Sequence, residues 1–390
     1  MLGVLLARAG VDVLVLEKHA DFLRDFRGDT IHPSTLEVMG ELGLLDALLR
    51  LPHQEVRELS ASVGGKAFPV ADFSHLPTRC RFIALMPQWD FLDLLAGHAR
   101  ERYPGFALWM RAEATDLVED GGRVAGVRVV TPDGVRLVRA GLVIAADGRH
   151  SVVRAKAGLA VEELGAPMDV LWFRLSRRPE DPDETMGHFE SGRILVVINR
   201  GAYWQCGYVI AKGSLDDLRA RGIEALRQAI AELVPYARDR MGEIRSFEDL
   251  SLLTVRVDRL TRWYRPGLLC IGDAAHAMSP IGGVGINLAI QDAVAAANEL
   301  AGPLAGGGLA VDHLQRVQQR REWPTRVTQR VQVLVQRKII ARVLGHRGPS
   351  RPPLALGLLA QLPWLRRGAA RLIGIGVRPE HVRLPGPSGR

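Results

Sequence analysis

A strand, a glycine-rich loop and a long helix follow one another between residues 267 and 300, and few folds accommodate that order. The stretch reads GLLCIGDAAHAMSPIGGVGINLAIQDAVAAANEL. Its apolar run ends at Asp273, and the glycines of 282–285 open a helix near Ile286. In open α/β sheets ligands bind beyond the carboxyl ends of the strands, where a carboxylate accepts hydroxyl hydrogen bonds and a helix N-terminus favours negative charge. Because an ordinary strand–helix junction also needs glycine, this stretch alone leaves a ligand site and a purely structural turn open.

The N-terminal residues are typical of the second half of a βαβ unit. Apolar residues recur at helical spacing in 2–9, and the β-branched run 11–16 ends at Glu17. In a dinucleotide-binding βαβ unit, an acidic residue at this place binds a ribose hydroxyl about 20 residues after the glycine fingerprint. A short surface helix followed by an ordinary strand and a solvated Glu17 is the alternative.

The pattern between and after these stretches predicts an interrupted α/β domain. The expected elements are a helix over 35–49, a hairpin over 56–68, a helix over 90–100 and a three-stranded meander over 112–147. From about 170 to 256, β-like runs surround one amphipathic helix over 215–233, which predicts an inserted, mainly β domain. We expect domain boundaries at 1–160, 161–264, 265–320 and 321–390, the last being a basic helical region.

Composition excludes several classes of protein. With 390 residues and 47% hydrophobic content, the chain can bury cores of domain size. Its three cysteines, Cys80, Cys206 and Cys270, are far apart and odd in number. Neither a disulfide framework nor a zinc site is therefore indicated, and a reduced, cytoplasmic setting is expected. The sequence has no run of 18 apolar residues and no signal-peptide pattern.

The positive charge is concentrated in the C-terminal part. The formal net charge is +8, and residues 301–390 contain 16 Lys and Arg but only three Asp and Glu. Solvated helix faces, nucleic acid and an anionic membrane surface are the three interpretations. Since there is no zinc finger, RNP motif or interleaved basic and aromatic patch, we expect no nucleic acid partner. The alternation of apolar segments and arginines in 352–377 fits a helical cap on the first domain or a peripheral membrane contact.

Three features of the sequence occur together: Glu17 after a βα segment, AADGRHSVVR over 145–154, and IGDAAHAMSPIGGVGINLAIQDA over 271–293. This combination resembles the class A flavoprotein monooxygenases, whose prototype fold is that of p-hydroxybenzoate hydroxylase. The second and third are similar to the family's DG and GD motifs, in the expected order and with a sheet inserted between them. Over residues 1–300, the resemblance implies an α/β fold with a Rossmann-like FAD-binding domain, an inserted mainly β substrate domain and a C-terminal helical region.

The resemblance also implies which residues bind FAD. Glu17 matches the carboxylate that binds the adenosine ribose, and Asp273 matches the one that binds the ribityl chain. Arg27 resembles the arginine that reaches the pyrophosphate, a solvated loop arginine being the alternative. Gln88 resembles a polar residue that contacts FAD at a helix start, an N-terminal helix cap being the alternative.

The stretches similar to the DG and GD motifs contain the remaining residues that the resemblance assigns to the cofactor. Asp147, with Arg149 and Arg154, belongs to the motif associated with both FAD and the nicotinamide cofactor. Pro280 resembles the proline close to the flavin ring. The backbone amides at the flavin pyrimidine edge match those of Gly285, Ile286 and Asn287. Reduced flavin is anionic there, and a helix N-terminus would stabilise it by about 0.3 to 1 kcal/mol.

The reaction implied by the resemblance is a hydroxylation. NADH or NADPH reduces FAD, dioxygen adds to give a flavin hydroperoxide, and one oxygen atom passes to an electron-rich aromatic or polyketide-like substrate. The candidate walls of the substrate pocket on the inserted sheet, with plain core packing as the alternative, are Trp172, Phe189, Tyr203 and Trp204. His276 belongs to the GD pattern and is not assigned as a general base. We assign no catalytic residue and no metal site.

Two other functions fit the same residues. One is different flavin chemistry, by a reductase, a Baeyer-Villiger enzyme or a halogenase. The other is a flavin-free protein that binds through its basic tail. One departure from the family bears on both: the family begins with a strand and a GxGxxG turn, and neither precedes the apolar stretch 2–9. That segment corresponds to roughly 12 to 20 residues, and we expect the translation start to lie upstream of Met1.

Overall fold

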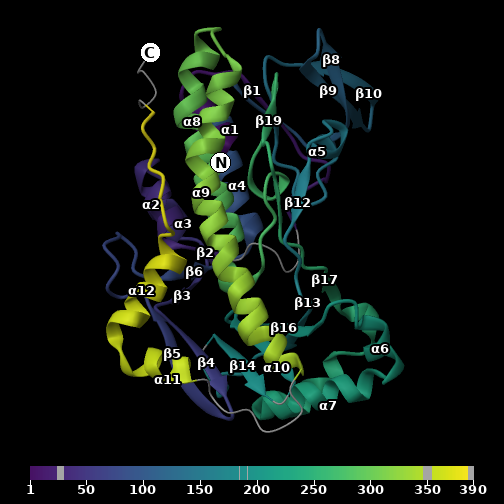
Figure 1. Cartoon of the computed structure of the whole chain (residues 1–390), viewed down its shortest axis with the longest axis vertical. Helices are drawn as coiled ribbons and strands as arrows, with labels where there is room; N and C mark the ends of the chain where they lie inside the picture. The colour runs from purple at the N-terminus through teal and green to yellow at the C-terminus, as the bar shows by residue number, and fades with distance from the viewer. Residues whose placement is uncertain (24–29, 184, 191, 346–353, 385–390) are drawn as a thin grey trace.

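The structure is a computed structural model that describes residues 1–23, 30–183, 185–190, 192–345 and 354–384. Along its long axis, an α/β part occupies one end and a seven-stranded sheet the other (Figure 1). A long helix from the C-terminal part of the chain runs beside both parts, and a second long helix lies next to it at the α/β part.

Two parallel strand pairs form the centre of the α/β part. β1 (Val13–Leu16) pairs with β7 (Phe106–Trp109), and β11 (Val143–Ala145) pairs with β20 (Leu268–Cys270). β20 also pairs antiparallel with β19 (Tyr264–Arg265). Parallel strands need crossover connections, and helices pack on these strands in one buried core. These helices are α1 (Leu2–Arg8), α4 (Gln88–Arg102) and α8 (Gly285–Ala305).

Smaller sheets complete this part. One sheet has the order β2 (Thr30–Ile31), β6 (Ile83–Leu85) and β3 (Gln54–Val56). The expected meander is present as β8 (Glu113–Asp120), β9 (Arg123–Thr131) and β10 (Gly134–Arg139). The strand β12 (Val161–Glu163) pairs with β18 (Asp258–Leu260), and the short helix α5 (Val152–Lys156) follows β11.

The seven-stranded sheet takes its strands from two distant parts of the chain. Their spatial order is β17 (Ser251–Leu253), β13 (Met168–Ser176), β16 (Tyr203–Ala211), β15 (Arg193–Asn199), β14 (Met186–Glu190), β4 (Glu58–Val63) and β5 (Lys66–Asp72). The hairpin β4–β5 comes from residues that the sequence analysis placed in the first domain. It joins because β4 pairs in parallel with β14, from Met186 opposite Ser60 to Phe189 opposite Val63. Neither edge of β14 is thus left open, since β15 pairs with its other side.

Two expected single helices are each divided in the structure. The helix expected over 35–49 is α2 (Pro33–Glu41) and α3 (Leu45–Leu49), and the helix expected over 215–233 is α6 (Leu215–Ala220) and α7 (Ile223–Leu233). Gly43 and Gly222 lie at the breaks with φ of 73° and 84°. A right-handed helix cannot continue through that conformation.

The seven-stranded sheet is covered on both faces. One face packs in a common core with α7 and the following 3-10 helix η1 (Pro235–Glu243), which η2 (Phe247–Asp249) follows along the chain. The other face contacts the end of the long C-terminal helix. Because both faces are apolar, the strands are buried on both sides, as in a sheet between two layers of helices.

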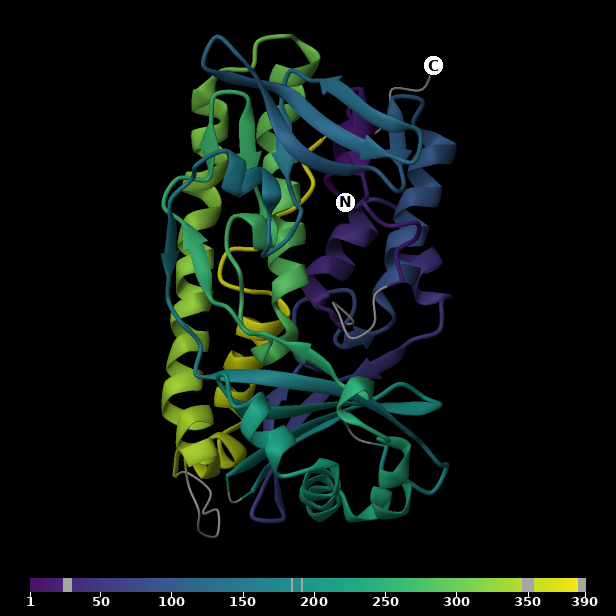
Figure 2. The same ribbon diagram turned by 90° about the vertical axis from the view of Figure 1, so that its right-hand side faces the viewer.

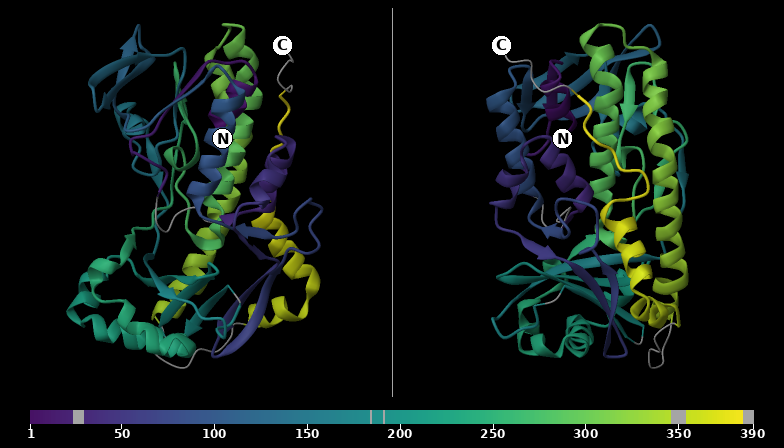
Figure 3. Two further views of the ribbon diagram at one scale, coloured as in Figure 1. Left: turned by 180° about the vertical axis from the view of Figure 1, so that it is seen from behind. Right: turned by 90° about the vertical axis from the view of Figure 1, so that its left-hand side faces the viewer.

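The long helices α8 and α9 (Val311–Val335) lie side by side (Figure 2). α9 continues through the π-helical turn η5 (Gln336–Ile340) into α10 (Ala341–Gly345), which contacts β15 and β16. The last helices, α11 (Leu354–Gln361) and α12 (Pro363–Gly374), lie against β5 of the sheet (Figure 3). The expected helical cap therefore packs on the seven-stranded sheet, and it reaches the α/β part where the Ile373 carbonyl contacts His32. Among the described residues, no helix is both long and apolar enough to cross a membrane.

Candidate active site

The N-terminus of α8 is fixed by the side chain of Asn287. Its Oδ1 accepts hydrogen bonds from the His32 amide at 2.9 Å and from Thr35 Oγ1 at 2.8 Å. Its Nδ2 donates to the carbonyls of Thr30 at 3.0 Å and Gly283 at 3.2 Å. Three of these bonds join α8 to β2 and the start of α2, and the fourth holds the turn that directly precedes α8.

The first backbone amides of α8 have no partner within the described chain. The first helical hydrogen bond runs from Leu288 N–H to the Val284 carbonyl, at 2.9 Å. The amides of Gly285, Ile286 and Asn287 precede it, and no described residue accepts a hydrogen bond from them. These three amides, together with the positive end of the helix dipole, form a site that favours negative charge. This role of their backbone was predicted from the sequence, whereas the long-range bonds of the Asn287 side chain were not.

Asp273 lies in the turn that follows β20. Gly272 has a φ of 57°, and a Cβ added there would lie 2.9 Å from Cβ of Ala289 in α8. Only glycine therefore allows this turn to approach α8 so closely. The Asp273 side chain is 28% exposed, and its Oδ2 lies 3.4 Å from Nη2 of Arg149. Burial raises the pKa of Asp273, whereas the charge of Arg149 acts in the opposite direction.

The DG-like stretch approaches the same turn. Arg149 Nη1 is buried and has no partner among the described residues. Arg154 holds the stretch against β18 and the turn η3 (Gly272–Ala274). Its guanidinium contacts Asp258 Oδ1 and the Ala274 carbonyl, both at 3.4 Å, and the Arg149 carbonyl at 2.9 Å. Side chains of the DG-like stretch therefore contact the GD-like turn directly.

The contacts of Asp147 are those of a helix cap. Its carboxylate accepts hydrogen bonds from Ser151 Oγ and from the Val153 amide, the latter at 3.3 Å. Ser151 is the N-cap of α5 and accepts a hydrogen bond from the Arg154 amide at 2.9 Å. Asp147 therefore stabilises the start of α5, and the cofactor contact that the resemblance implied stays a prediction.

The other predicted cofactor residues come from separate elements. Glu17 follows β1, where its Oε1 accepts a hydrogen bond from the His19 amide at 2.9 Å. Gln88 is the first residue of α4, and Pro87 occupies the N-cap position, so Gln88 is not the N-cap that the alternative proposed. Pro280 precedes the 3-10 turn η4 (Ile281–Gly283), and its carbonyl accepts the Gly283 amide at 3.1 Å. Arg27 lies outside the described residues.

The four candidate substrate residues divide between the two faces of the sheet. Trp172 and Phe189 share a face and pack in one cluster with Ile281, which directly follows Pro280. By strand alternation Tyr203 lies on this face too, with the Arg174 guanidinium 4.9 Å from its ring centroid.

Trp204 lies on the opposite face, in the core shared with α7, and is 1% exposed. Its Nε1 donates to Asp181 Oδ2 at 3.1 Å. Trp204 is therefore a core residue and not a wall of a pocket facing α8.

A buried ionic network beneath the GD-like turn was not visible in the sequence. His276 Nε2 lies 2.6 Å from Asp292 Oδ2, and Asp292 also accepts the Gly272 amide at 3.0 Å and Arg321 Nε at 2.9 Å. Burial alone would raise the pKa of Asp292, but His276 and Arg321 hold it below its usual value. These contacts make His276 a structural residue. An aspartate within the alanine-rich stretch of α8 is the only signal that the sequence offered for the network.

Three comparisons with known proteins bear on this site. The sequence profile of a family described as FAD binding domain matches residues 1–331. A 6-methylpretetramide 4-monooxygenase from Streptomyces rimosus is 32% identical over 386 residues, which cover 98% of this chain and 91% of that protein.

Solved structures agree in fold. The p-nitrophenol 4-monooxygenase PnpA from Pseudomonas putida DLL-E4 has a TM-score of 0.77 at 20% identity, covering 95% of this chain and 93% of the other. The anhydrotetracycline hydroxylase OxyS from Streptomyces rimosus has a TM-score of 0.73 at 24% identity, covering 96% of this chain and 72% of the other. These matches confirm the predicted fold class.

Proposed function

Since this chain belongs to the FAD-binding family and is an FAD-dependent monooxygenase of class A, we propose that it hydroxylates an aromatic, polyketide-like small molecule. FAD is its cofactor, and NAD(P)H is the reductant typical of the class. The chain spans nearly the whole length of the 6-methylpretetramide 4-monooxygenase to which it is similar, which supports a multi-ring aromatic substrate.

The described residues fit FAD. Three amides without an acceptor stand at the start of α8, and a partly exposed carboxylate, Asp273, lies in the neighbouring turn. Arg149 adds a buried guanidinium nitrogen that has no partner in the described part of the chain. Such a set suits a ligand that carries both hydroxyl groups and delocalised negative charge. When bound, FAD supplies the redox and oxygen chemistry, using NAD(P)H and dioxygen.

Each of these residues then has a specific task. Asp273 accepts hydrogen bonds from the ribityl hydroxyls, and Arg149 holds its carboxylate in place. The amides of 285–287 donate to the pyrimidine edge, where the helix N-terminus favours negative charge by up to about 2 kcal/mol in a partly buried site. Their unused donors are the observation that carries the proposal.

The remaining assignments are part of the same proposal. Glu17 binds the adenosine ribose, Pro280 lies beside the flavin ring, and Gln88 and Arg27 contribute further polar contacts to FAD. Trp172 and Phe189 bound the substrate on the sheet face that packs against Ile281. Their apolar surface would keep water away from the reacting atoms, which the transfer of oxygen requires.

The test combines flavin, reductant and labelled dioxygen. The purified chain is supplied with FAD and incubated with NADH or NADPH, isotopically labelled dioxygen and a panel of phenols and multi-ring aromatics. We expect an accepted substrate to accelerate NAD(P)H oxidation and to gain one labelled oxygen atom. A reduced or halogenated product without label would indicate other flavin chemistry, and failure to bind any FAD would favour a flavin-free binding protein.

The C-terminal region carries a separate proposal, which is peripheral contact with an anionic membrane. On α12, Trp364 is 66% exposed, and the side chains of Arg367 and Arg371 are exposed at helical spacing from it. Exposed Trp beside Arg is typical of interfacial helices. We propose a cytoplasmic location, in keeping with three buried cysteines that form no disulfide in the described structure.

A further inference from the structure

A stripe of buried polar residues, most of them glutamines, runs along one face of α9 and into η5. A helix usually turns apolar side chains to the core and polar ones to solvent. Here the buried members of the stripe, at intervals that keep them on one face, are Gln318, Thr325, Gln329, Gln332 and Gln336. Burial of amides without partners would be costly, so their bonds need to be accounted for.

The amide groups bind the backbone of the segment that leads to α8. Gln329 Nε2 donates to the carbonyls of Asp258 at 2.7 Å and Ala277 at 3.1 Å. Gln332 makes three such bonds. Its Oε1 accepts the Ser279 amide at 3.1 Å, and its Nε2 donates to the carbonyls of Ser279 and Ile281, both at 3.0 Å.

Gln336 strengthens the same contact from the next turn. Its Nε2 donates to Ser279 Oγ at 2.8 Å, and that hydroxyl oxygen also accepts the Ile281 amide at 3.3 Å. Between these two residues, Pro280 has no amide hydrogen of its own. Ser279 and Pro280 belong to no helix or strand. The side chains of Gln332 and Gln336 therefore provide hydrogen-bond partners that regular secondary structure would otherwise supply.

We infer that Gln332 is a positioning residue for the flavin. By holding Ser279 and Ile281, it fixes Pro280 between them and sets the start of α8, whose amides follow only a few residues later. This inference rests on the proposed flavin site. Gln332 would act through Pro280 and the amides of 285–287 and would not itself touch FAD.

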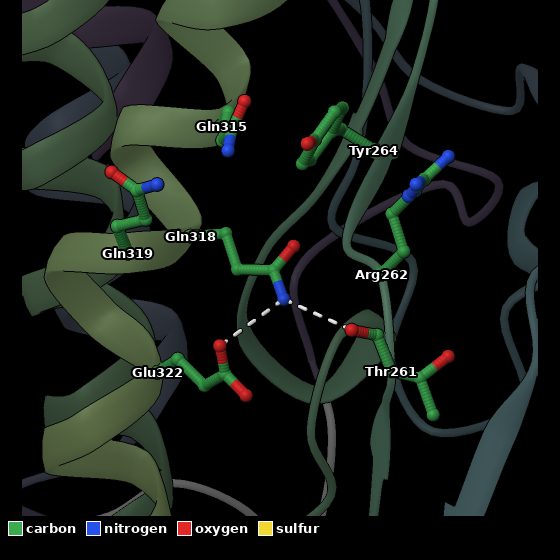
Figure 4. A pocket seen from close by; sticks show the side chains of 7 residues that line it. All are labelled: Thr261, Arg262, Tyr264, Gln315, Gln318, Gln319 and Glu322. Carbon is green, nitrogen blue, oxygen red and sulfur yellow. Dashed lines mark hydrogen bonds between the residues drawn. The ribbon is translucent and has the colours of Figure 1, made fainter.

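Gln318 provides a matched control on the same helix face. It is also a buried glutamine with a two-sided backbone contact, since its Oε1 accepts the Trp263 amide at 3.0 Å and its Nε2 donates to the Thr261 carbonyl at 3.1 Å. It lies beside a polar pocket of about 250 Å³ between α9 and the strand β19, where it also contacts Glu322 (Figure 4). Gln318 thus holds a different segment and has no bond to 279–281 in the described structure.

The experiment compares Gln332→Leu with Gln318→Leu. In the flavin-free protein, amide hydrogen exchange is measured over 277–288 for both variants. With FAD added, the dissociation constant, the visible circular dichroism of bound flavin and the fraction of NAD(P)H oxidation that ends in hydrogen peroxide are measured. Gln332→Glu is a second variant in case Gln332→Leu does not fold, because a carboxylate keeps the acceptor for Ser279 and loses both donors.

We expect Gln332→Leu to speed exchange at Ser279 and to weaken FAD binding about tenfold or more, because three backbone groups lose partners. Gln332→Glu keeps the acceptor for the Ser279 amide but leaves the carbonyls of Ser279 and Ile281 without their donor, so it should weaken FAD binding in the same direction. The flavin dichroism should change and peroxide release should rise. Gln318→Leu should alter thermal stability while the flavin measurements stay within about twofold of the original protein, since its bonds lie elsewhere. Equal flavin measurements in the Gln332 and Gln318 variants would overturn the inference. An original protein that binds no FAD would instead overturn the proposed function, whereas the exchange result would still show whether Gln332 holds the segment.

Discussion

Arg149 and Asp273 are 124 residues apart in the sequence, yet Arg149 Nη2 lies 3.4 Å from Asp273 Oδ2. The contact joins the loop after β11 to the turn after β20, at the carboxyl ends of two neighbouring parallel strands. Ligands of open α/β sheets bind at that edge. A change at either residue therefore tests the proposed cofactor site directly.

We predict that Asp273→Ala weakens FAD binding by about 10- to 100-fold, because a charge-assisted hydrogen bond is worth about 1.5 to 3 kcal/mol. Asp273→Asn, which keeps one acceptor oxygen, should lose less. Titration of the flavin-free protein with FAD measures both constants. Asp133→Ala is the control, since the Asp133 side chain is 79% exposed and pairs with Arg136 at the surface. Equal affinity in Asp273→Ala and Asp133→Ala would remove Asp273 from the site.

Asp147 gives a prediction that separates a helix cap from a cofactor ligand. Asp147→Ala should lower the free energy of unfolding of the flavin-free protein by about 1 kcal/mol, as expected for a lost cap at the start of a helix. Urea unfolding without FAD measures this. An unchanged midpoint without FAD, combined with lost FAD affinity, would instead support the cofactor role that the resemblance implied.

Local patterns predicted the elements around the candidate site better than they predicted the sheet. The strand–loop–helix order around Asp273 is encoded in consecutive residues, and the observed elements β20, η3 and α8 match it. The pairing of β14 with β4 joins Met186 to Ser60, and no local pattern encodes which distant hairpin fills a strand's edge. The domain boundary expected at residue 161 therefore leaves β4 and β5 out of the sheet to which they belong.

Alternation alone could not assign the aromatic residues to faces. In a sheet with one solvated face, polar and apolar residues alternate and the buried face can be read directly. Here both faces are buried, so the neighbouring residues Tyr203 and Trp204 give no sign of which one faces α8. Similarly, Gln332 and Arg321 look like solvent-facing residues of a basic helix, whereas the structure buries them against backbone groups and Asp292.

The third prediction concerns pH. Burial lowers the pKa of His32 to about 4, although its bond to the Ile373 carbonyl acts the other way. The unfolded chain then takes up the proton first as pH falls, so stability should be lost from about pH 6.5 down to about 4, by about 3 kcal/mol in total. The Ile373 carbonyl oxygen lies 2.8 Å from His32 Nδ1. In His32→Asn the side-chain amide can donate to the same oxygen, and it does not titrate in this pH range.

Chemical unfolding at half-unit steps from pH 4 to 8 measures this dependence. The difference in unfolding free energy between the original protein and His32→Asn should be constant above about pH 7 and change below it. A difference in unfolding free energy that is the same at every pH reflects altered packing. Only a difference that changes with pH reflects the titration of His32. A difference that is flat over the whole range would show that His32 is not the group responsible.

The last prediction addresses the outer face of α12. The inner face is already used, since Ala370 and Ile375 pack with Phe73 of the neighbouring sheet region. The outer face leaves Trp364 and two arginines to solvent. A Trp side chain at the membrane interface is stabilised by contact with the lipid headgroup region. Each arginine near an anionic surface adds about 1 kcal/mol of electrostatic attraction, which salt weakens. We therefore predict that the chain sediments with anionic vesicles, less so at high salt, and does not sediment with neutral vesicles.

Trp364→Ala should reduce the bound fraction several-fold, whereas Trp323→Ala, a change at a tryptophan 54% exposed on α9, should not. Equal loss in the two variants would show that exposed tryptophan in general, and not α12, causes the binding; no binding to anionic vesicles would leave α12 as a packed cap only.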